Sequence, residues 1–219
     1  FEPAKGLSSW SNTVPGDSQP AGAPAVKVGS AEAPGAVAWE GGLRILESGV
    51  QGDRAISTRR KFDWTPDMKG AWIQATFELV ADRVEDSASA ARIGYFIALH
   101  DFNDRDSGGG NVLLDGNPKG GAPVHLDYPG SDSKGIGTIG AAGYRPGHRF
   151  GVRVTGTDGG SFRLEHLVDG ALESKSLTLA AADLPDGGFG FEYCCGRSFV
   201  VDNVVIETSD ESIDSVARK

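Results

Sequence analysis

A two-residue alternation of apolar and polar side chains recurs along this sequence and constrains the fold more than any other feature. In residues 71–80, Ile73, Ala75, Phe77 and Leu79 fall on one side of an extended chain, and mostly polar residues fall on the other. Successive side chains of a strand point to opposite faces, so the pattern predicts an antiparallel strand with one buried and one solvated face. Further strands are predicted at residues 92–100, 149–155, 161–168, 188–193 and 198–207.

Glycine-rich segments separate these runs, and the chain has 32 glycines without a three-residue period. The pair Asp169-Gly170 predicts a tight hairpin turn between two strands. Residues 104–110, 115–121 and 128–140 are interpreted as connections. The last of these contains G-x-G-x-x-G at 135–140, which lacks the preceding strand and following helix that a dinucleotide site requires. Many short strands without a convincing helix predict a sandwich or a closed sheet.

The domain organisation is predicted from where this alternation begins and ends. Residues 1–38 carry five prolines and little periodicity, so they are expected to be a loop-rich segment that wraps the sandwich. Residues 39–208 are predicted to form one β-sandwich domain, and 209–219 a C-terminal tail. A single all-β domain can use a chain of this length.

Charge and cysteine content restrict the partners and the compartment. A net charge of −9 argues against binding nucleic acid, and no apolar run is long enough to predict a membrane span. The two cysteines, Cys194 and Cys195, are neighbours, so a bridge between them would be a strained ring; reduced thiols and an oxidised pair both stay open. The acidity, few Met and Cys residues and Gly/Asp/Ser-rich loops favour a secreted, periplasmic or cell-surface protein.

Four segments resemble those of a known superfamily. Residues 162–170 (FRLEHLVDG) resemble the strand and D-G turn of concanavalin A-like and laminin-G-like jelly rolls. Residues 184–191 (LPDGGFGF) and 198–206 (SFVVDNVVI) are similar to two later segments, and Phe1-Glu2 to the opening. The resemblance implies an all-β, antiparallel β-sandwich of the concanavalin A-like jelly-roll type. That superfamily includes lectins, carbohydrate-binding modules, glucanases, polysaccharide lyases and adhesion modules, and the fold does not choose among them.

The polar faces of the predicted strands supply candidate ligand-binding residues. A tryptophan offers a flat apolar surface to a sugar ring, and amide, carboxylate and guanidinium groups bind hydroxyls or anions. The arginines favour an anionic polysaccharide; the alternative is an ordinary solvated sheet face. The candidates are Trp72, Gln74, Glu78, Arg92, His100, Arg149 and Arg153.

The expected function is a non-catalytic carbohydrate-binding or surface-recognition module of an exported protein. The glucanases of the resembled superfamily carry Glu-x-Asp-x-x-Glu, and this chain contains no Glu-x-Asp. Two alternatives stay open: a structural adhesion module, or a carbohydrate-active enzyme (glycoside hydrolase or polysaccharide lyase) with Glu78 and His100 as its acid and base.

Calcium is the candidate ion. Residues 100–106 offer several hard oxygen ligands in one loop. The resemblance additionally implies a structural ion that links the first and last strands, with Glu2 and Asp202 as ligands. Of the four histidines, His166 falls on the apolar face of its strand and is predicted to be a hydrogen-bonded core residue.

Overall fold

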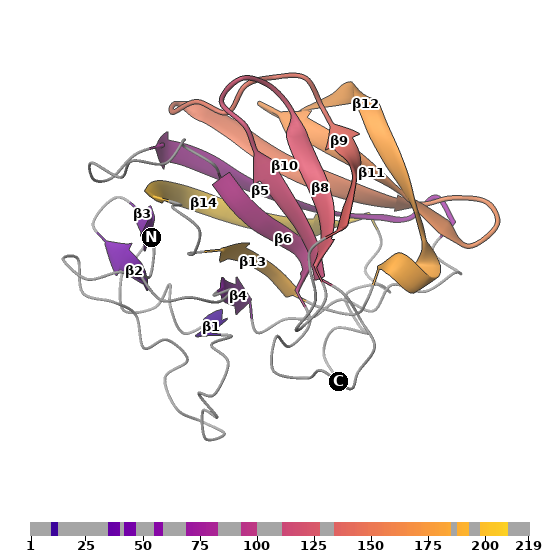
Figure 1. The fold of residues 1–219 in the computed structure, drawn as a ribbon, viewed down its shortest axis with the longest axis horizontal. Helices are drawn as coiled ribbons and strands as arrows, with labels where there is room; N and C mark the ends of the chain where they lie inside the picture. Colours follow the sequence, from indigo (N-terminus) through magenta and orange to yellow (C-terminus); the bar gives the residue numbers. More distant parts are fainter. Residues whose placement is uncertain are drawn as a thin grey trace.

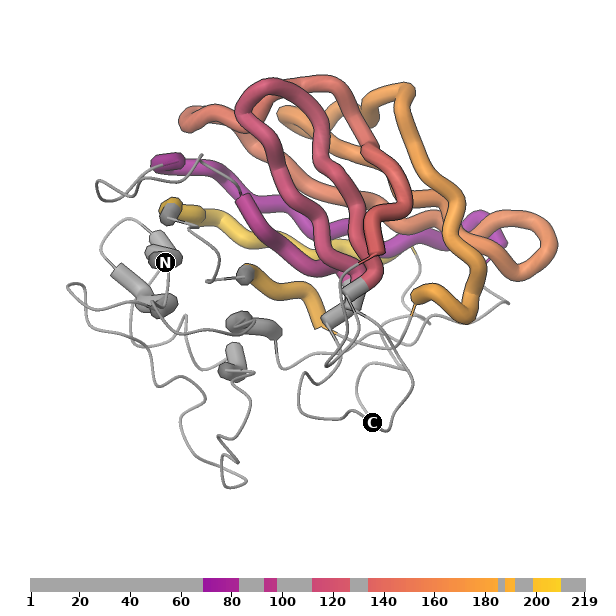
Figure 2. Tube along the Cα trace, in the orientation of Figure 1, coloured from indigo at the N-terminus to yellow at the C-terminus, as the bar shows by residue number. Residues whose placement is uncertain are grey.

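A computed structural model places the strands in two layers (Figure 1). It describes residues 10–12, 35–39, 42–46, 55–58, 69–82, 93–99, 111–127, 134–184, 188–192 and 198–209. Figure 2 follows the same chain as a tube and shows the strands of the two layers running alongside one another. Within the described residues no helix is long and apolar enough to cross a membrane.

Each layer is a seven-stranded antiparallel sheet. The first sheet has the order β1 (Trp10–Asn12), β4 (Ala55–Thr58), β13 (Gly188–Glu192), β6 (Ile93–Leu99), β7 (Asn111–Gly116), β8 (Ala122–Asp127), β9 (Lys134–Ile139). The second has the order β12 (Ala171–Ala180), β11 (Ser161–Val168), β10 (His148–Gly156), β5 (Trp72–Ala81), β14 (Ser198–Thr208), β3 (Gly42–Leu46), β2 (Gly35–Trp39). One 3-10 turn, η2 (Ala181–Asp183), follows β12. The predicted fold class, an antiparallel β-sandwich, is confirmed.

The core lies between the sheets and is built from the apolar faces that the alternation predicts. Ile73, Ala75, Phe77 and Leu79 of β5 are all 0% exposed. Aromatic rings join the layers: the Phe77 ring centroid lies 5.1 Å from that of Tyr95 and 5.2 Å from that of Phe191, both in edge-on geometry. Edge-to-face pairs of this kind add to the free energy gained by burying the rings.

The strands β10, β11 and β12 form a meander of short connections. The hairpin predicted at Asp169-Gly170 is confirmed, because these two residues join β11 to β12 with φ values of 50° and 83°. A two-residue hairpin of this type needs positive φ at both positions, which glycine and aspartate tolerate better than other residues.

Two strands, β7 and β9, include residues that were interpreted as connections. β7 has buried side chains on both faces, with Val112 and Leu114 at 0% and Leu113 at 5% exposed, so it shows no alternation. β9 contains Gly135 and Gly137 and is an edge strand, held through its backbone pairing with β8. The interpretation of residues 128–140 as a loop is therefore wrong for 134–139. An irregular segment and then β10 follow β9, so the glycine pattern has no helix after it.

The predicted N-terminal segment contributes to the sheets. β1 forms an edge of the first sheet and β2 an edge of the second, and the predicted domain boundary at residue 39 falls within β2. Of the predicted tail, Ser209 is described, and its backbone N–H donates to the Trp72 carbonyl at 2.9 Å. Cys194, Cys195 and Glu2 lie outside the described residues.

Candidate functional site

The strand register gathers five of the predicted binding residues on the outward face of the second sheet. β5 and β10 pair so that Arg153 lies opposite Gln74, Arg149 opposite Glu78 and Thr155 opposite Trp72. β14 flanks β5 on its other side. We call this surface the polar face; its residues are Trp72, Gln74, Thr76 and Glu78 of β5, Arg149, Arg153 and Thr155 of β10, Glu165 of β11, and Asp202 and Glu207 of β14. The predicted Arg92 and His100 lie outside the described residues.

At one end of the polar face, an arginine, a tryptophan and a glutamine form a joined group. The Arg153 guanidinium carbon lies 4.4 Å from the centroid of the Trp72 ring, a cation–π contact. Its Nε and Nη2 donate to Gln74 Oε1 at 3.0 and 2.8 Å. The Gln74 amide in turn donates to Glu207 Oε2 at 2.6 Å, and Gln74 is only 9% exposed. The guanidinium is therefore held over the indole by a partner that is itself fixed.

At the other end, Arg149 is anchored by neighbouring strands. Its Nε and Nη2 donate to Thr76 Oγ1 at 3.1 and 2.9 Å, and Nη2 also donates to the Asn203 carbonyl at 2.7 Å. The Asn203 side chain donates to Glu78 Oε2 at 2.9 Å. Asn203 has φ of 48°, at a point where the register of β14 against β5 shifts between Asp202 and Val205. Such bulges redirect side chains on a sheet face.

The polar face carries both signs of charge. Its two arginines lie among the carboxylates of Glu78, Glu165, Asp202 and Glu207. Glu165 accepts from Thr155 Oγ1 at 2.9 Å and pairs with Arg163 of its own strand at 2.9 Å. Donors and acceptors thus alternate over short distances, which suits hydroxyl groups, because a hydroxyl both donates and accepts.

Sequence reasoning missed two residues that anchor the side chains of this face. Glu207 anchors Gln74, and Asn203 connects Arg149 to Glu78. Both lie in a run that was predicted as a strand, but the alternation of one strand does not identify the neighbouring strand in the sheet. The sequence signal that points to Asn203 is its place in the D-N pair of the resembled closing segment.

The residues predicted for catalysis are not assembled within the described part of the chain. Glu78 binds the Asn203 amide, and His100 lies outside the described residues. On the first sheet, His125 Nε2 lies 3.7 Å from Asp115 Oδ2, which is beyond hydrogen-bond range.

The predicted calcium ligands are likewise not assembled there. Asp202 Oδ1 accepts the backbone N–H of Asn203 at 2.7 Å, and Glu2 is outside the described residues. The described residues contain no group of three or more His, Cys, Asp or Glu side chains placed to hold a metal ion. The loop 100–106, the other predicted source of oxygen ligands, lies outside the described residues.

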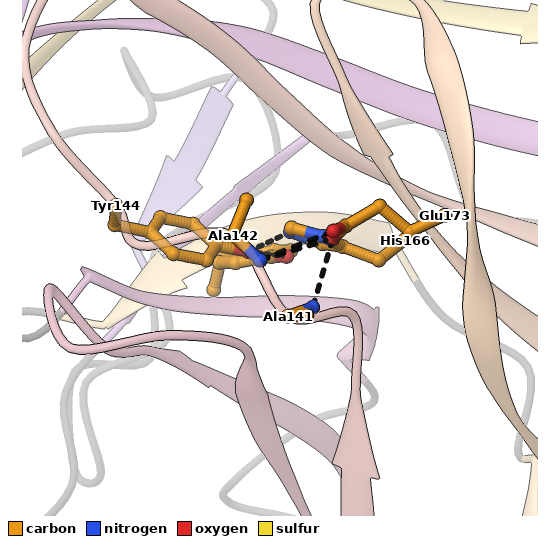
Figure 3. Close-up of polar contacts among 6 residues, drawn as sticks. Ala141, Ala142, Tyr144, His166 and Glu173 are labelled. Atoms are coloured by element: carbon orange, nitrogen blue, oxygen red, sulfur yellow. Dashed lines mark hydrogen bonds and ion pairs between the residues drawn. The ribbon is translucent and has the colours of Figure 1, made fainter.

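A second polar cluster lies inside the sandwich (Figure 3). Tyr95 Oη of β6 lies 2.5 Å from Tyr144 Oη, which lies 2.7 Å from His166 Nε2 of β11. His166 Nδ1 lies 2.5 Å from Glu173 Oε2 of β12. Tyr95 and His166 are 0% exposed, and Tyr144 is 1% exposed, so no solute reaches their polar atoms. The prediction that His166 is a hydrogen-bonded core histidine is confirmed.

Glu173, at the outer end of this cluster, binds the backbone of Ala141 and Ala142. Glu173 accepts the N–H of Ala141 at 3.1 Å and that of Ala142 at 3.1 and 3.4 Å. Burial acts to raise the pKa of Glu173, but the bonds from His166 and from these two N–H groups outweigh it and lower that pKa. Burial lowers the pKa of His166, with Glu173 opposing it, and burial raises the pKa of Tyr144 well above its ordinary value.

The arrangement of the sheets is that of a concanavalin A-like jelly roll. Lectin I from Ulex europaeus, solved with the methyl glycoside of α-L-fucose, matches with a TM-score of 0.50 and 15% identity over 79% of this chain and 89% of the lectin. The VIP36 exoplasmic/lumenal domain in a Ca²⁺/Man-bound form matches with a TM-score of 0.48 and 12% identity over 79% of each chain. The family 7 polysaccharide lyase AlgAT5, an alginate lyase, matches with a TM-score of 0.47 and 14% identity over 94% of this chain and 96% of the lyase. No family profile and no curated protein sequence matches the chain.

Proposed function

We propose that this chain is a non-catalytic glycan-recognition module that binds sugar on the polar face of the second sheet. The observation that carries the proposal is the joined group of Trp72, Arg153 and Gln74, in which the Arg153 guanidinium lies over one face of the Trp72 ring and Gln74 holds it there; the sugar would pack on the indole surface that Arg153 does not cover. Sugar recognition needs this combination, because a pyranose has apolar C–H faces and a rim of hydroxyls. The jelly-roll fold supports the proposal only in that lectins also use it.

The ligand that fits the polar face is rich in hydroxyl groups. Each guanidinium is already bonded to a neighbouring oxygen, and carboxylates surround both arginines. An anionic polysaccharide would meet these carboxylates as well as the arginines, so uronic acids are the less favoured ligands. We further propose that the module is exported, consistent with its composition.

The test is a glycan array probed with the wild-type chain in calcium-containing buffer, with each hit then incubated and examined for shortened products. Trp72→Ala should abolish binding, at least a ten-fold loss, while the melting temperature stays within a few degrees. The matched control is Lys119→Ala, which removes an exposed basic residue between β7 and β8 of the first sheet and should bind normally.

The other outcomes separate the alternatives. Normal binding by Trp72→Ala would place the site elsewhere, and absence of binding to any glycan would favour the adhesion module. Product formation that Glu78→Gln stops without weakening binding would make the protein an enzyme. If a chelator leaves both binding and melting temperature unchanged, calcium has no role.

A further inference from the structure

The buried Tyr95–Tyr144–His166–Glu173 cluster has a defined direction of hydrogen bonding. An ionised carboxylate only accepts, so His166 Nδ1 carries the hydrogen that Glu173 receives. In a neutral imidazole Nε2 is then an acceptor, and Tyr144 must donate to it. Tyr95 in turn donates to Tyr144 Oη. Every polar atom of the cluster is satisfied in this state, and the direction runs from the core toward the edge of the sandwich.

A second proton on His166 reverses this direction. Nε2–H would then donate to Tyr144, whose own hydrogen must turn to Tyr95 Oη. The hydrogen of Tyr95 is left without an acceptor, because Tyr144 is the hydrogen-bond partner that the described residues give it, and its ring packs on Phe77 and Phe189. A buried donor without a partner is costly, and so is a buried cation, so the closed structure disfavours the imidazolium.

The cluster holds the segment 140–144, which joins the edge strand β9 of the first sheet to β10 of the second. Gly140 N–H donates to the Lys175 carbonyl of β12 at 2.9 Å, and Glu173 accepts the next two N–H groups. At the end of the segment, the Tyr144 hydroxyl is hydrogen-bonded to His166 Nε2. These hydrogen bonds connect the edge of the first sheet at β9 to the edge of the second sheet at β12. His166 is the buried residue of this connection.

The titratable groups that face His166 are few. Glu173 approaches from β12, Tyr144 from the segment before β10, and Tyr95 lies beyond Tyr144 from β6. β10 presents Phe150, whose ring centroid lies 6.2 Å from that of His166. The His148 ring centroid lies 6.3 Å from that of Phe150, and His148 pairs with the exposed Asp169. In the described part of the chain, Glu173 is thus the charged group in direct contact with His166.

We propose that His166 and Glu173 form an acid-operated latch: uptake of a second proton by His166 releases the segment 140–144 and separates the edges β9 and β12. This inference is independent of the proposed glycan binding. The open form exposes His166 to water, where it binds a proton at its ordinary pKa of about 6.5. Below that pH the open form gains up to about ten-fold in population per pH unit, until the pKa of the closed form is reached.

The test is amide hydrogen exchange of the full chain, followed by NMR from about pH 7.5 to about pH 4.5 and corrected for the intrinsic pH dependence of exchange. Protection of Ala141 and Ala142 should fall about ten-fold per unit below pH 6.5. Protection of Thr157, whose N–H donates to the Ser161 carbonyl in the β10–β11 turn, is the internal control and should stay constant. Equal loss at all three amides would show global unfolding and overturn the latch, as would constant protection at Ala141.

Two variants assign the effect to the histidine. His166→Gln cannot take up the proton, so its protection at Ala141 should not depend on pH over this range. His148→Gln removes the neighbouring surface histidine and should behave as wild type. If His166→Gln does not fold, NMR of the ring nitrogens of the wild-type protein is the second test. The latch requires neutral His166 with the hydrogen on Nδ1 at neutral pH, and a titration midpoint of His166 below the ordinary value of about 6.5. A doubly protonated His166 ring at pH 7 would refute it.

Discussion

Arg153 and Trp72 form a diagonal cation–π pair across neighbouring strands, with the guanidinium carbon 4.4 Å from the ring centroid. The pair does not depend on the two side chains alone. Gln74 accepts two N–H groups from Arg153 and is itself anchored by Glu207, so residues from β5, β10 and β14 hold one guanidinium in place. A group fixed in this way loses little conformational entropy when a ligand binds.

The anchoring of Arg153 predicts different costs for two substitutions. Arg153→Ala should lower the free energy of unfolding by about 1 kcal/mol, because it removes the cation–π contact and leaves Gln74 Oε1 without its donor. Arg153→Lys keeps the charge but not the two parallel bonds, and should fall between Arg153→Ala and wild type. Urea denaturation measures both. Arg163→Ala is the control, and a cost equal to that of Arg153→Ala would contradict the anchoring.

Two substitutions of Asn203 distinguish the effect of its left-handed backbone conformation on stability from the effect of its side chain. Asn203→Gly and Asn203→Ala both remove the amide that binds Glu78, but only alanine is strained at φ of 48°. The alanine variant should therefore be less stable than the glycine variant by about 1–2 kcal/mol. Chemical denaturation of the two proteins side by side gives the difference directly. Equal stabilities would mean that the bulge relaxes in the alanine variant.

Two glycines with similar φ values provide a matched test of the space beside the latch. A Cβ on Gly140 would clash with His166 Nδ1 and lie 2.5 Å from Glu173 Oε2, whereas a Cβ on Gly159 meets nothing within 4 Å. Gly159→Ala should cost about 1 kcal/mol for the left-handed conformation, and Gly140→Ala at least about 2 kcal/mol more. Thermal unfolding of both variants checks this. Similar melting temperatures would show that the latch has room to move.

The pKa shifts of the latch predict that acid lowers global stability. Folding lowers the pKa of His166 below its ordinary value near 6.5. The contribution of neutral His166 to the free energy of unfolding is therefore fully present above pH 6.5 and falls as the pH drops below that value. The pKa of Glu173 is also lowered, so its contribution is lost at lower pH still, as the carboxylate of the folded protein becomes protonated. Glu173→Gln should be less stable than wild type at neutral pH, and the difference should shrink in acid. Urea midpoints across the pH range test this; a constant difference would be the contrary result.

The sequence predicted this fold where the alternation was strong and missed it where both faces of a strand are covered. β5 and β10 have one apolar and one polar face, and their predicted bounds agree with the structure to within one residue. β7 is buried on both faces, and β9 is glycine-rich and depends on backbone pairing, so neither produces a two-residue period.

The sequence predicted only part of the candidate site, because alternation assigns a residue to a face of its strand but does not identify the neighbouring strands. Trp72, Gln74 and Arg153 were identified as outward-facing because alternation assigns a face to each residue. Their anchor Glu207 could not be identified, because it lies 133 residues from Gln74 and the order of strands in a sheet is not written in any one strand. The cluster around His166 was missed for the same reason, since Tyr95, Tyr144 and Glu173 come from three separate segments.

The pairing of β5 with β14 also governs how the chain reaches this structure. The meander of β10, β11 and β12 closes through short turns, so its loop-closure entropy is small and it is expected to form early. β14 joins β5 across more than half of the chain and separates it from β3 and β2. The second sheet is therefore completed by long-range contacts of β14 with β5 and with β3, and folding should be slow, with refolding rates set by the docking of β14 rather than by the hairpins.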